Sequence, residues 1–340
     1  MDKYVTKNGS MTLLVSPFGN IFTKGWKNPS TKFKEDRLDA IYIPTLARKG
    51  EPVSNIDSLL KYADEVVLMY TDTVASWTAK YKKNVRIECM NQQVDFSAQY
   101  FSRKENQNLS VKWRPAFDIP LKRSFALFDA KRNSYKRILL LDDDIFLSER
   151  DICCGMAGLC LNYAIVGFHV VDFPDVSTID HIERIIKGTD NIISMTGSCM
   201  FLNIDCIYGD FLNVYNEDLF FYLTQPDPDK VVSGGIIYQQ PYKPWMDLSR
   251  IRHEQFGDLI YEALKRRFLG FTSDYINWAD EIEIRLKRIE ALCSDAIEER
   301  MFQALNAAIN AIHEIEVQDI EKFLKYSRLA SWATRYMKKT

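Results

Sequence analysis

The sequence predicts a mainly parallel α/β sheet flanked by helices, followed by a helical C-terminal region. Three observations predict this fold class. Short apolar runs alternate with helical patterns between residues 38 and 245, which is typical of βαβ units. From Leu248 onward the sequence is almost wholly amphipathic helix. The chain has 340 residues, of which 46% are hydrophobic and 13% aromatic, so it can bury a large core.

The apolar runs place the expected elements along the α/β region. Ser54 and Asp57 have capping-box spacing, so a helix is expected to begin near Ser54. Thr71–Asp72–Thr73 leads from the second strand into a helix that runs toward Lys80. The expected strands are 40–44, 65–70, 84–89, 137–141, 194–205 (with a turn) and 231–240, and further helices are expected over about 119–132 and 216–223.

Residues 152–171 form an apolar stretch long enough to cross a bilayer. The stretch contains Asn162, His169 and several glycines, and aspartates flank it. A buried helix followed by a buried parallel strand has the same composition. We therefore expect this second structure, with His169 as a structural residue.

Composition and charge exclude several classes of protein. The net charge is −2 and the pI is near 6.2, so tight non-specific binding to nucleic acid is not expected. The seven cysteines contain no C-x-x-C pair, which favours reduced core cysteines in a cytoplasmic protein. The opening residues MDKYVTKNGS have no apolar run, and no secretory signal is expected.

Three consecutive aspartates, Asp142–Asp144, follow the apolar strand at 137–141. Ligands bind at the carboxyl ends of parallel strands, and the same rule selects Thr45–Arg48 and Asp72 as candidate site residues. Like charges this close repel unless a cation compensates them. An Asp-x-Asp pair offers the oxygen ligands that Mg²⁺ and Mn²⁺ prefer. A metal site is expected here, and the alternative is a solvated acidic turn.

Two further features lie downstream of the aspartates. Asn216–Glu217–Asp218 precedes an apolar helical run; a carboxylate at this position can serve as a general base or can simply complement the helix dipole. His253 lies further along the chain. Its imidazole can ligate Mn²⁺ beside a carboxylate such as Asp144.

Taken in this order, the motifs resemble the GT-A glycosyltransferases, in particular the family-2-like inverting enzymes. The resemblance rests on P-T-L-A-R at 44–48, an Asp after the second strand, the D-x-D motif after the fourth and the later E-D pair, and it covers about residues 38–255. It implies a Rossmann-like GT-A catalytic domain over 38–245, with a nucleotide-sugar half (about 38–148) and an acceptor half (about 149–245), between an N-terminal β-rich extension (1–37) and a helical C-terminal region (246–340).

The resemblance also implies a role for each matching residue. Asp144 would bind a divalent metal, Mn²⁺ or Mg²⁺, on the donor diphosphate, with His253 at the third metal-side position. Asp218 would be the catalytic base, with Glu217 beside it. The nucleotide-sugar would be bound by Pro44, Thr45 and Arg48 at the base and ribose, by Asp72 at the base, by Lys122 and Arg123 before the D-x-D strand, by Asp142 and Asp143 toward the ribose or sugar, and by Gly197 and Ser198 in the acceptor-side loop.

The implied function is metal-dependent transfer of a sugar, of the hexosyltransferase type, from a nucleoside-diphosphate sugar to an acceptor hydroxyl with inversion. TDTV stands where the family commonly has D-D-G-S, so both UDP- and GDP-sugars remain candidate donors, and the acceptor is not identified. The amphipathic helices of 248–340 need an apolar partner. They are expected either to fold back over the catalytic domain or to pair with a second subunit in a homo-oligomer.

Other functions stay open. A phosphatase of the haloacid-dehalogenase type would carry Thr where Phe146 stands, and a sugar-nucleotide pyrophosphorylase, which is a nucleotidyltransferase, would have a glycine-rich loop in place of TLARKG. A retaining GT-A enzyme shares the D-x-D motif. A non-enzymatic binding module would use the helical C-terminal region as its interaction surface.

Overall fold

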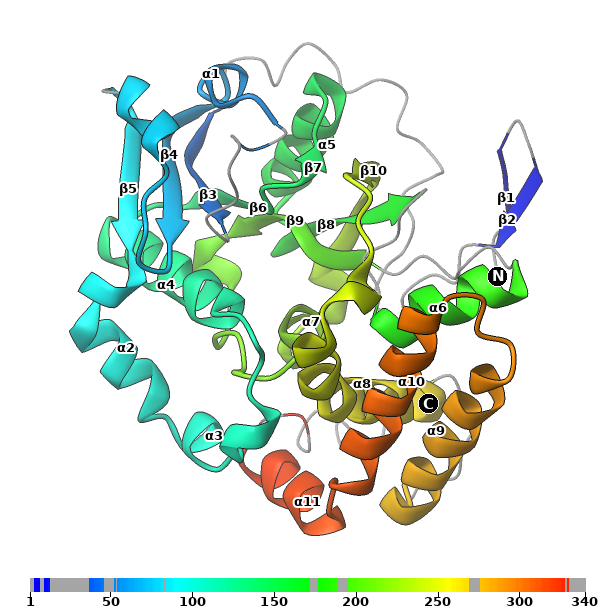
Figure 1. The fold of residues 1–340 in the computed structure, drawn as a ribbon. Helices are drawn as coiled ribbons and strands as arrows, with labels where there is room; N and C mark the ends of the chain where they lie inside the picture. The colour runs from blue at the N-terminus through cyan, green and yellow to red at the C-terminus, as the bar shows by residue number, and fades with distance from the viewer. Residues whose placement is uncertain are drawn as a thin grey trace.

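The computed structural model describes residues 3–6, 9–12, 37–45, 52, 54–81, 83–171, 177–188, 195–268, 276–327 and 329. An eight-stranded sheet forms its centre (Figure 1). A separate two-stranded sheet is the hairpin of β1 (Lys3–Thr6) and β2 (Gly9–Thr12). This hairpin lies within the expected β-rich extension, most of which falls outside the described residues.

The strands of the large sheet are β3 (Leu38–Pro44), β4 (Ala63–Tyr70), β5 (Val85–Cys89), β6 (Arg137–Leu141), β7 (Ile145–Phe146), β8 (Ile165–Val171), β9 (Met195–Asn203) and β10 (Val231–Gln239). Their order is β5-β4-β3-β6-β9-β8-β10-β7. β9 is antiparallel to β6 and β8, and β7 is antiparallel to β10, whereas the other neighbours are parallel. The carboxyl ends of β3, β4, β6 and β10 therefore meet the amino end of β9 at one edge.

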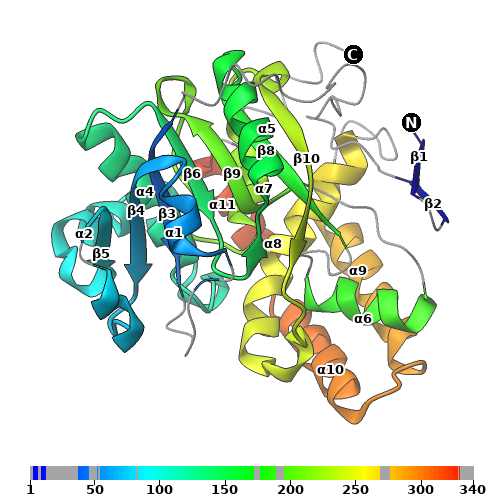
Figure 2. The same cartoon turned by 90° about the horizontal axis from the view of Figure 1, so that it is seen from above.

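Helices cover both faces of this sheet (Figures 1 and 2). On one face Leu59 and Met156 join a buried apolar cluster with the sheet residue Phe201. On the other face Phe125 and Phe220 pack with Leu140. The α-helices are α1 (Ile56–Leu59), α2 (Val94–Phe101), α3 (Lys104–Gln107), α4 (Ile119–Arg132), α5 (Glu149–Cys160), α6 (Thr178–Lys187), α7 (Glu217–Thr224), α8 (Leu248–Phe268), α9 (Trp278–Cys293), α10 (Glu299–His313) and α11 (Val317–Tyr326). Short 3₁₀ turns are η2 (Ser76–Lys80), η3 (Met90–Gln92), η4 (Val111–Trp113), η5 (Ile204–Cys206), η6 (Pro228–Lys230) and η7 (Pro244–Met246).

The C-terminal helices fold back onto the α/β part of the chain. Phe256 of α8 and Ile312 of α10 belong to the same buried cluster as Leu140 of β6. Phe256 also stacks on Trp113, with ring centroids 5.4 Å apart. Of the two arrangements expected for this region, the structure shows the one in which the helices fold back over the α/β part of the chain. None of the helices in the described ranges is both long and apolar enough to cross a membrane.

Several expected elements are confirmed with their bounds. α4 and β6 coincide with the predicted helix 119–132 and strand 137–141, and the stretch 152–171 is a buried helix followed by a strand. The helix expected to begin near Ser54 is α1, but Ser54 does not cap it. Asn55 caps α1 by accepting a hydrogen bond from the Ser58 N–H, while the Ser54 hydroxyl donates to the Ile145 carbonyl at 2.7 Å. The helix predicted toward Lys80 is only the 3₁₀ turn η2.

Candidate functional site

The candidate site lies at the sheet edge where the carboxyl ends of β3, β4, β6 and β10 meet the amino end of β9. Pro44 is the last residue of β3, Thr45 follows it and is buried, and Asp72 is exposed just after β4. Arg48 lies outside the described residues. The topology thus brings Thr45, Asp72 and the D-x-D segment to one edge, as the strand-end rule predicts.

Lys122 of α4 contacts residues that directly follow two of these strands. Its ammonium group is fully buried and donates to the Thr45 carbonyl at 2.9 Å and to the Thr71 hydroxyl at 3.0 Å. It also pairs with an Asp118 carboxylate oxygen at 2.7 Å. A lysine has three N–H donors, so all three are used. Lys122 therefore links Thr45, just after β3, to Thr71, just after β4.

Arg123, the next residue of α4, faces carboxylates. One terminal nitrogen donates to both carboxylate oxygens of Asp142, at 2.9 and 3.0 Å. The other donates to a Glu217 oxygen at 2.7 Å. The guanidinium is buried, and its paired carboxylates raise its pKa. Arg123 therefore joins the end of β6 to the start of α7.

The charges around Arg123 do not balance. Three carboxylates, those of Asp142, Glu217 and Asp218, act electrostatically on this one guanidinium. Burial raises the pKa of Glu217 to about 8, with Asp218 adding to the shift and Arg123 opposing it. Burial and the neighbouring Asp144 raise the pKa of Asp142 to about 6, again against Arg123. Desolvation and like charges therefore favour the protonated form of Glu217, because the one shared cation offsets them only in part.

Asp218 is fixed by backbone groups. One carboxylate oxygen accepts the Gly197 N–H, and the other accepts the Leu219 N–H at 2.8 Å. Gly197 has no room for a side chain, since a Cβ there would lie 2.4 Å from Arg123 and 2.5 Å from Asp218. Gly197 and Ser198 lie in strand β9, within the strand expected over 194–205, and not in the acceptor-side loop that the resemblance implies. Because β9 is antiparallel to β6, its first residues reach the site edge.

Asp144 is held by the end of β10. It is buried; its carbonyl accepts the Gln240 N–H at 2.8 Å, and a carboxylate oxygen accepts the Gln239 amide at 3.2 Å. Gln239 is part of none of the sequence motifs described above. It ends the apolar run of β10, so the strand-end rule applied to that strand would have found it.

Two buried polar atoms beside these aspartates have no hydrogen-bond partner among the described residues. They are the Nε of Arg123 and the amide oxygen of Gln239. Buried polar groups normally have partners, so both atoms offer unused hydrogen-bonding capacity to a ligand. The Asp144 carboxylate and the Gln239 amide oxygen are also the hard oxygen donors that Mg²⁺ and Mn²⁺ accept. The residues present therefore fit a divalent cation that a substrate phosphate helps to bind.

The predicted pairing of Asp144 with His253 stays a prediction. His253 lies in α8, half-buried, and its Nδ1 has no hydrogen-bond partner within the part of the chain that the structure describes. Over the described ranges, no group of three or more His, Cys, Asp or Glu side chains is arranged to hold a metal ion. Asp143 is partly buried between Asp142 and Asp144.

Comparisons with known proteins identify no family. No protein-family profile and no curated protein matches the chain. Among solved structures, 4-diphosphocytidyl-2C-methyl-D-erythritol synthase from Anaerococcus prevotii DSM 20548 shares 10% sequence identity with a TM-score of 0.32, over 65% of this chain and 99% of that one. With a likeness this low, function has to be inferred from the site itself.

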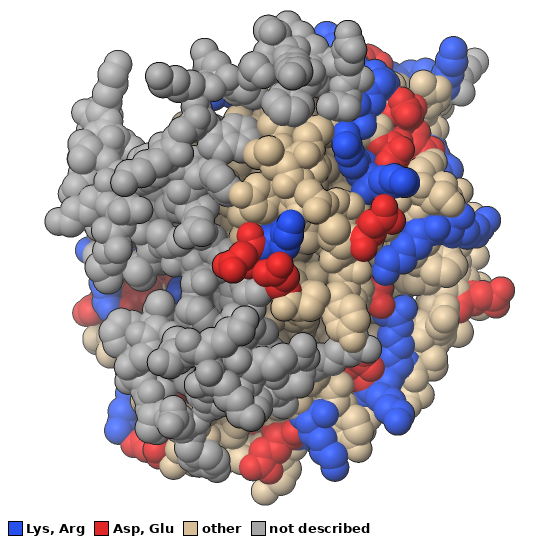
Figure 3. All heavy atoms as spheres, turned by 180° about the vertical axis from the view of Figure 1, so that it is seen from behind, with Lys and Arg blue, Asp and Glu red and all other residues tan. Residues whose placement is uncertain are grey.

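The charged surface does not indicate a second site on the face that Figure 3 shows. There, in the described part of the chain, basic and acidic side chains are interspersed rather than gathered in a field of one sign. This agrees with the formal net charge of −2.

Proposed function

We propose that the protein is a metal-dependent glycosyltransferase that moves a sugar from a UDP- or GDP-sugar to an acceptor hydroxyl with inversion. One observation carries the proposal: the buried Arg123 joins Asp142 of the D-x-D segment to Glu217 of the E-D pair at the carboxyl edge of the sheet. Two motifs separated by more than 70 residues in the sequence thus form one charged cluster. The resemblance to GT-A glycosyltransferases, drawn from the same motifs, supports the same reaction.

The donor side of the proposed site is built around β3, β4 and β6. Thr45 and Asp72 would contact the nucleoside, and Lys122 would hold Thr45 and Thr71 in place through its bonds to both residues. Asp142 would contact the ribose or sugar. The unpartnered Nε of Arg123 gives a cation next to the reacting centre, where negative charge develops on the departing diphosphate.

The metal would be held by Asp144, with Gln239 as a neighbouring oxygen donor and His253 as the predicted third position. When bound, a divalent cation neutralises charge on the diphosphate leaving group. In the present contacts, Gln239 and Gln240 hold the Asp144 side chain and backbone. Those two residues would therefore keep the carboxylate oriented toward the donor.

Asp218 would take the proton from the acceptor hydroxyl. Its oxygens accept the Gly197 and Leu219 N–H groups, which leaves each oxygen a second lone pair. The two backbone bonds fix the direction of the carboxylate, as a general base requires. Glu217, protonated and bonded to Arg123, would keep the number of negative charges beside the sugar low.

The test is a screen of UDP- and GDP-sugars with Mn²⁺, followed by analysis of the products. We expect release of a nucleoside diphosphate and a product whose anomeric configuration is opposite to that of the donor. The Asp218→Asn variant should lower transfer by roughly 10²- to 10⁴-fold with donor binding nearly unchanged, because the base is lost and the shape is kept. Retention of configuration would contradict the assigned base. Release of pyrophosphate or of inorganic phosphate alone would identify a nucleotidyltransferase or a phosphatase instead.

A further inference from the structure

The turn that presents Glu217 and Asp218 has an unusual residue at its start. Asn216 precedes α7 with φ +66°, in the left-handed region that side chains rarely adopt. Its carbonyl accepts the Phe220 N–H at 3.0 Å, which closes the first turn of α7. Its side chain does not cap α7, as Asn at this position commonly does. Instead the amide nitrogen donates to an Asp258 carboxylate oxygen of α8 at 2.9 Å.

A second contact holds the same turn against the same helix. Gly257 of α8 lies so close to the chain that a Cβ at this position would be 2.1 Å from the Tyr215 carbonyl oxygen. Only glycine allows this approach. Two consecutive residues of α8 therefore hold the turn. Gly257 packs closely against Tyr215, and Asp258 accepts a hydrogen bond from Asn216.

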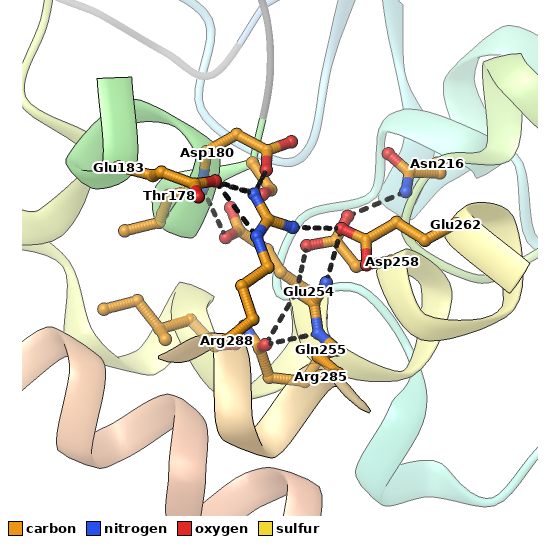
Figure 4. Close-up of polar contacts among 12 residues, drawn as sticks. Thr178, Asp180, Glu183, Asn216, Glu254, Gln255, Asp258, Glu262, Arg285 and Arg288 are labelled. Carbon is orange, nitrogen blue, oxygen red and sulfur yellow. Dashed lines mark hydrogen bonds and ion pairs between the residues drawn. The ribbon is translucent and has the colours of Figure 1, made fainter. Parts of the chain in front are cut away.

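Asp258 is itself held in place from α9. Arg285 is fully buried and donates to the second Asp258 oxygen at 2.7 Å, and it also binds Glu262 at 2.7 Å and Gln255 at 2.8 Å. Figure 4 shows Asn216 directed at this group, with the two arginines of α9, Arg285 and Arg288, lying among acidic side chains. Both carboxylate oxygens of Asp258 are therefore bonded, one to Asn216 at the start of α7 and the other to Arg285 of α9. These two bonds restrict rotation of the Asp258 side chain.

We propose that Asn216 and Asp258 are positioning residues that set the direction of the Glu217 and Asp218 side chains, so that helices α8 and α9 form part of the acceptor side of the site. The inference rests on the proposed function. It assigns the helical C-terminal region a role in the reaction beyond stabilising the fold. Rotation of the Asn216 backbone out of its left-handed conformation would redirect Asp218 and take its carboxylate away from the Gly197 N–H of β9.

Two substitutions remove the link at different ends. Asn216→Gly keeps the left-handed conformation accessible and deletes only the side chain, and Asp258→Ala deletes the acceptor. We expect each to lower kcat by about 10- to 100-fold, with the donor KM within about twofold, since a misdirected base slows the chemical step and leaves donor binding alone. The double variant should be no slower than the slower single variant, because both act through one hydrogen bond. If Asp258→Ala does not fold, Asn216→Gly carries the test, because it removes the donor of the same hydrogen bond.

A matched control separates positioning from stability. Glu183 binds Arg288 at 3.0 Å in the same network, and Figure 4 shows it on the opposite side of that network from Asn216. Glu183→Gln should therefore lower the melting temperature to a similar extent and leave kcat unchanged. Additive effects in the double variant, or an equal loss of kcat in the Glu183→Gln control, would show that the network only stabilises the fold.

Hydrogen exchange provides a readout that does not need the reaction. We expect the Gly197 and Leu219 amides to exchange at least about fivefold faster in Asn216→Gly and Asp258→Ala, and at the wild-type rate in Glu183→Gln. Unchanged exchange in the first two variants would overturn the positioning role even if kcat fell. If the wild type transfers no sugar from any donor, the proposed function fails by itself, and exchange still decides whether Asn216 and Asp258 hold the turn.

Discussion

Lys122 and Arg123 are adjacent in α4, both buried and both basic, yet they serve the two halves of the site in different ways. Lys122 bonds a backbone carbonyl, a hydroxyl and one carboxylate. Arg123 bonds two carboxylates and lies in the field of a third. Successive residues of a helix point about 100° apart, so one side chain reaches the ends of β3 and β4 and the other reaches β6 and α7.

The difference shows what each cation contributes. Around Lys122 the single charge of Asp118 balances the ammonium, and the remaining bonds organise neutral groups. Around Arg123 the carboxylates are in excess, and burial with the neighbouring charges raises the pKa of Glu217. The contacts beside β3 and β4 are therefore ordered by hydrogen bonds, whereas those between β6 and α7 depend on charge compensation.

Arg123→Ala should have the largest effect, because it removes the cation that joins β6 to α7. It leaves the buried Glu217 and the partly buried Asp142 without their partner, and loss of one partner of a buried ion pair lowers the free energy of unfolding by about 3–5 kcal/mol. Urea unfolding at pH 7 measures this. Arg252→Ala is the matched control, because it removes an exposed pair with Glu314, and it should change the free energy of unfolding by less than about 1 kcal/mol. Equal changes in the two variants would show that Arg123 is not a compensating charge.

Lys122→Met tests the contacts beside β3 and β4 and should have a smaller effect on the free energy of unfolding. Methionine keeps most of the apolar stem but removes the bonds to Thr45 and Thr71, so the free energy of unfolding should fall by about 1–3 kcal/mol. Binding of UDP or GDP, measured by calorimetry, should weaken because Lys122 no longer joins Thr45 to Thr71. Nucleotide affinity equal to that of the wild type would show that Lys122 does not contribute to nucleotide binding.

Glu217→Gln should have the smallest effect at about pH 4.5 and below, and a characteristic pH dependence above it. The folded pKa of Glu217, about 8, is above the ordinary value of 4.5, so the folded state binds more protons than the unfolded state between these pH values. Folding stability from this group is complete below about pH 4.5 and is lost as the pH rises through 8. The glutamine variant, which never ionises, should become more stable relative to the wild type by at least about 1 kcal/mol between pH 5 and 9.

Unfolding curves at several pH values measure this difference. Asp142 and Asp258, whose pKa values are also raised, titrate in both proteins, so the comparison isolates Glu217. Parallel stability profiles for the wild type and the variant would contradict a protonated Glu217.

Local pattern alone determined much of this protein. The apolar run at 137–141 and the helical pattern at 119–132 became β6 and α4 with their predicted bounds, because apolar periodicity reports burial directly. The rule that ligands meet strand ends placed Thr45, Asp72 and Asp142–Asp144 at one edge. Arg123 and Glu217 were selected from motifs, although nothing in the spacing of the motifs required them to meet.

The tertiary structure decided which groups touch. Gly197 reaches the site because β9 runs antiparallel to β6, a direction that its apolar pattern does not encode. Asn216 and Asp258 are ordinary residues in sequence, and only the packing of α8 against the start of α7 turns them into a bonded pair. The physical reason is that periodicity records how deeply a residue is buried, whereas the partner of a buried polar atom depends on distant segments that meet only once the core has formed.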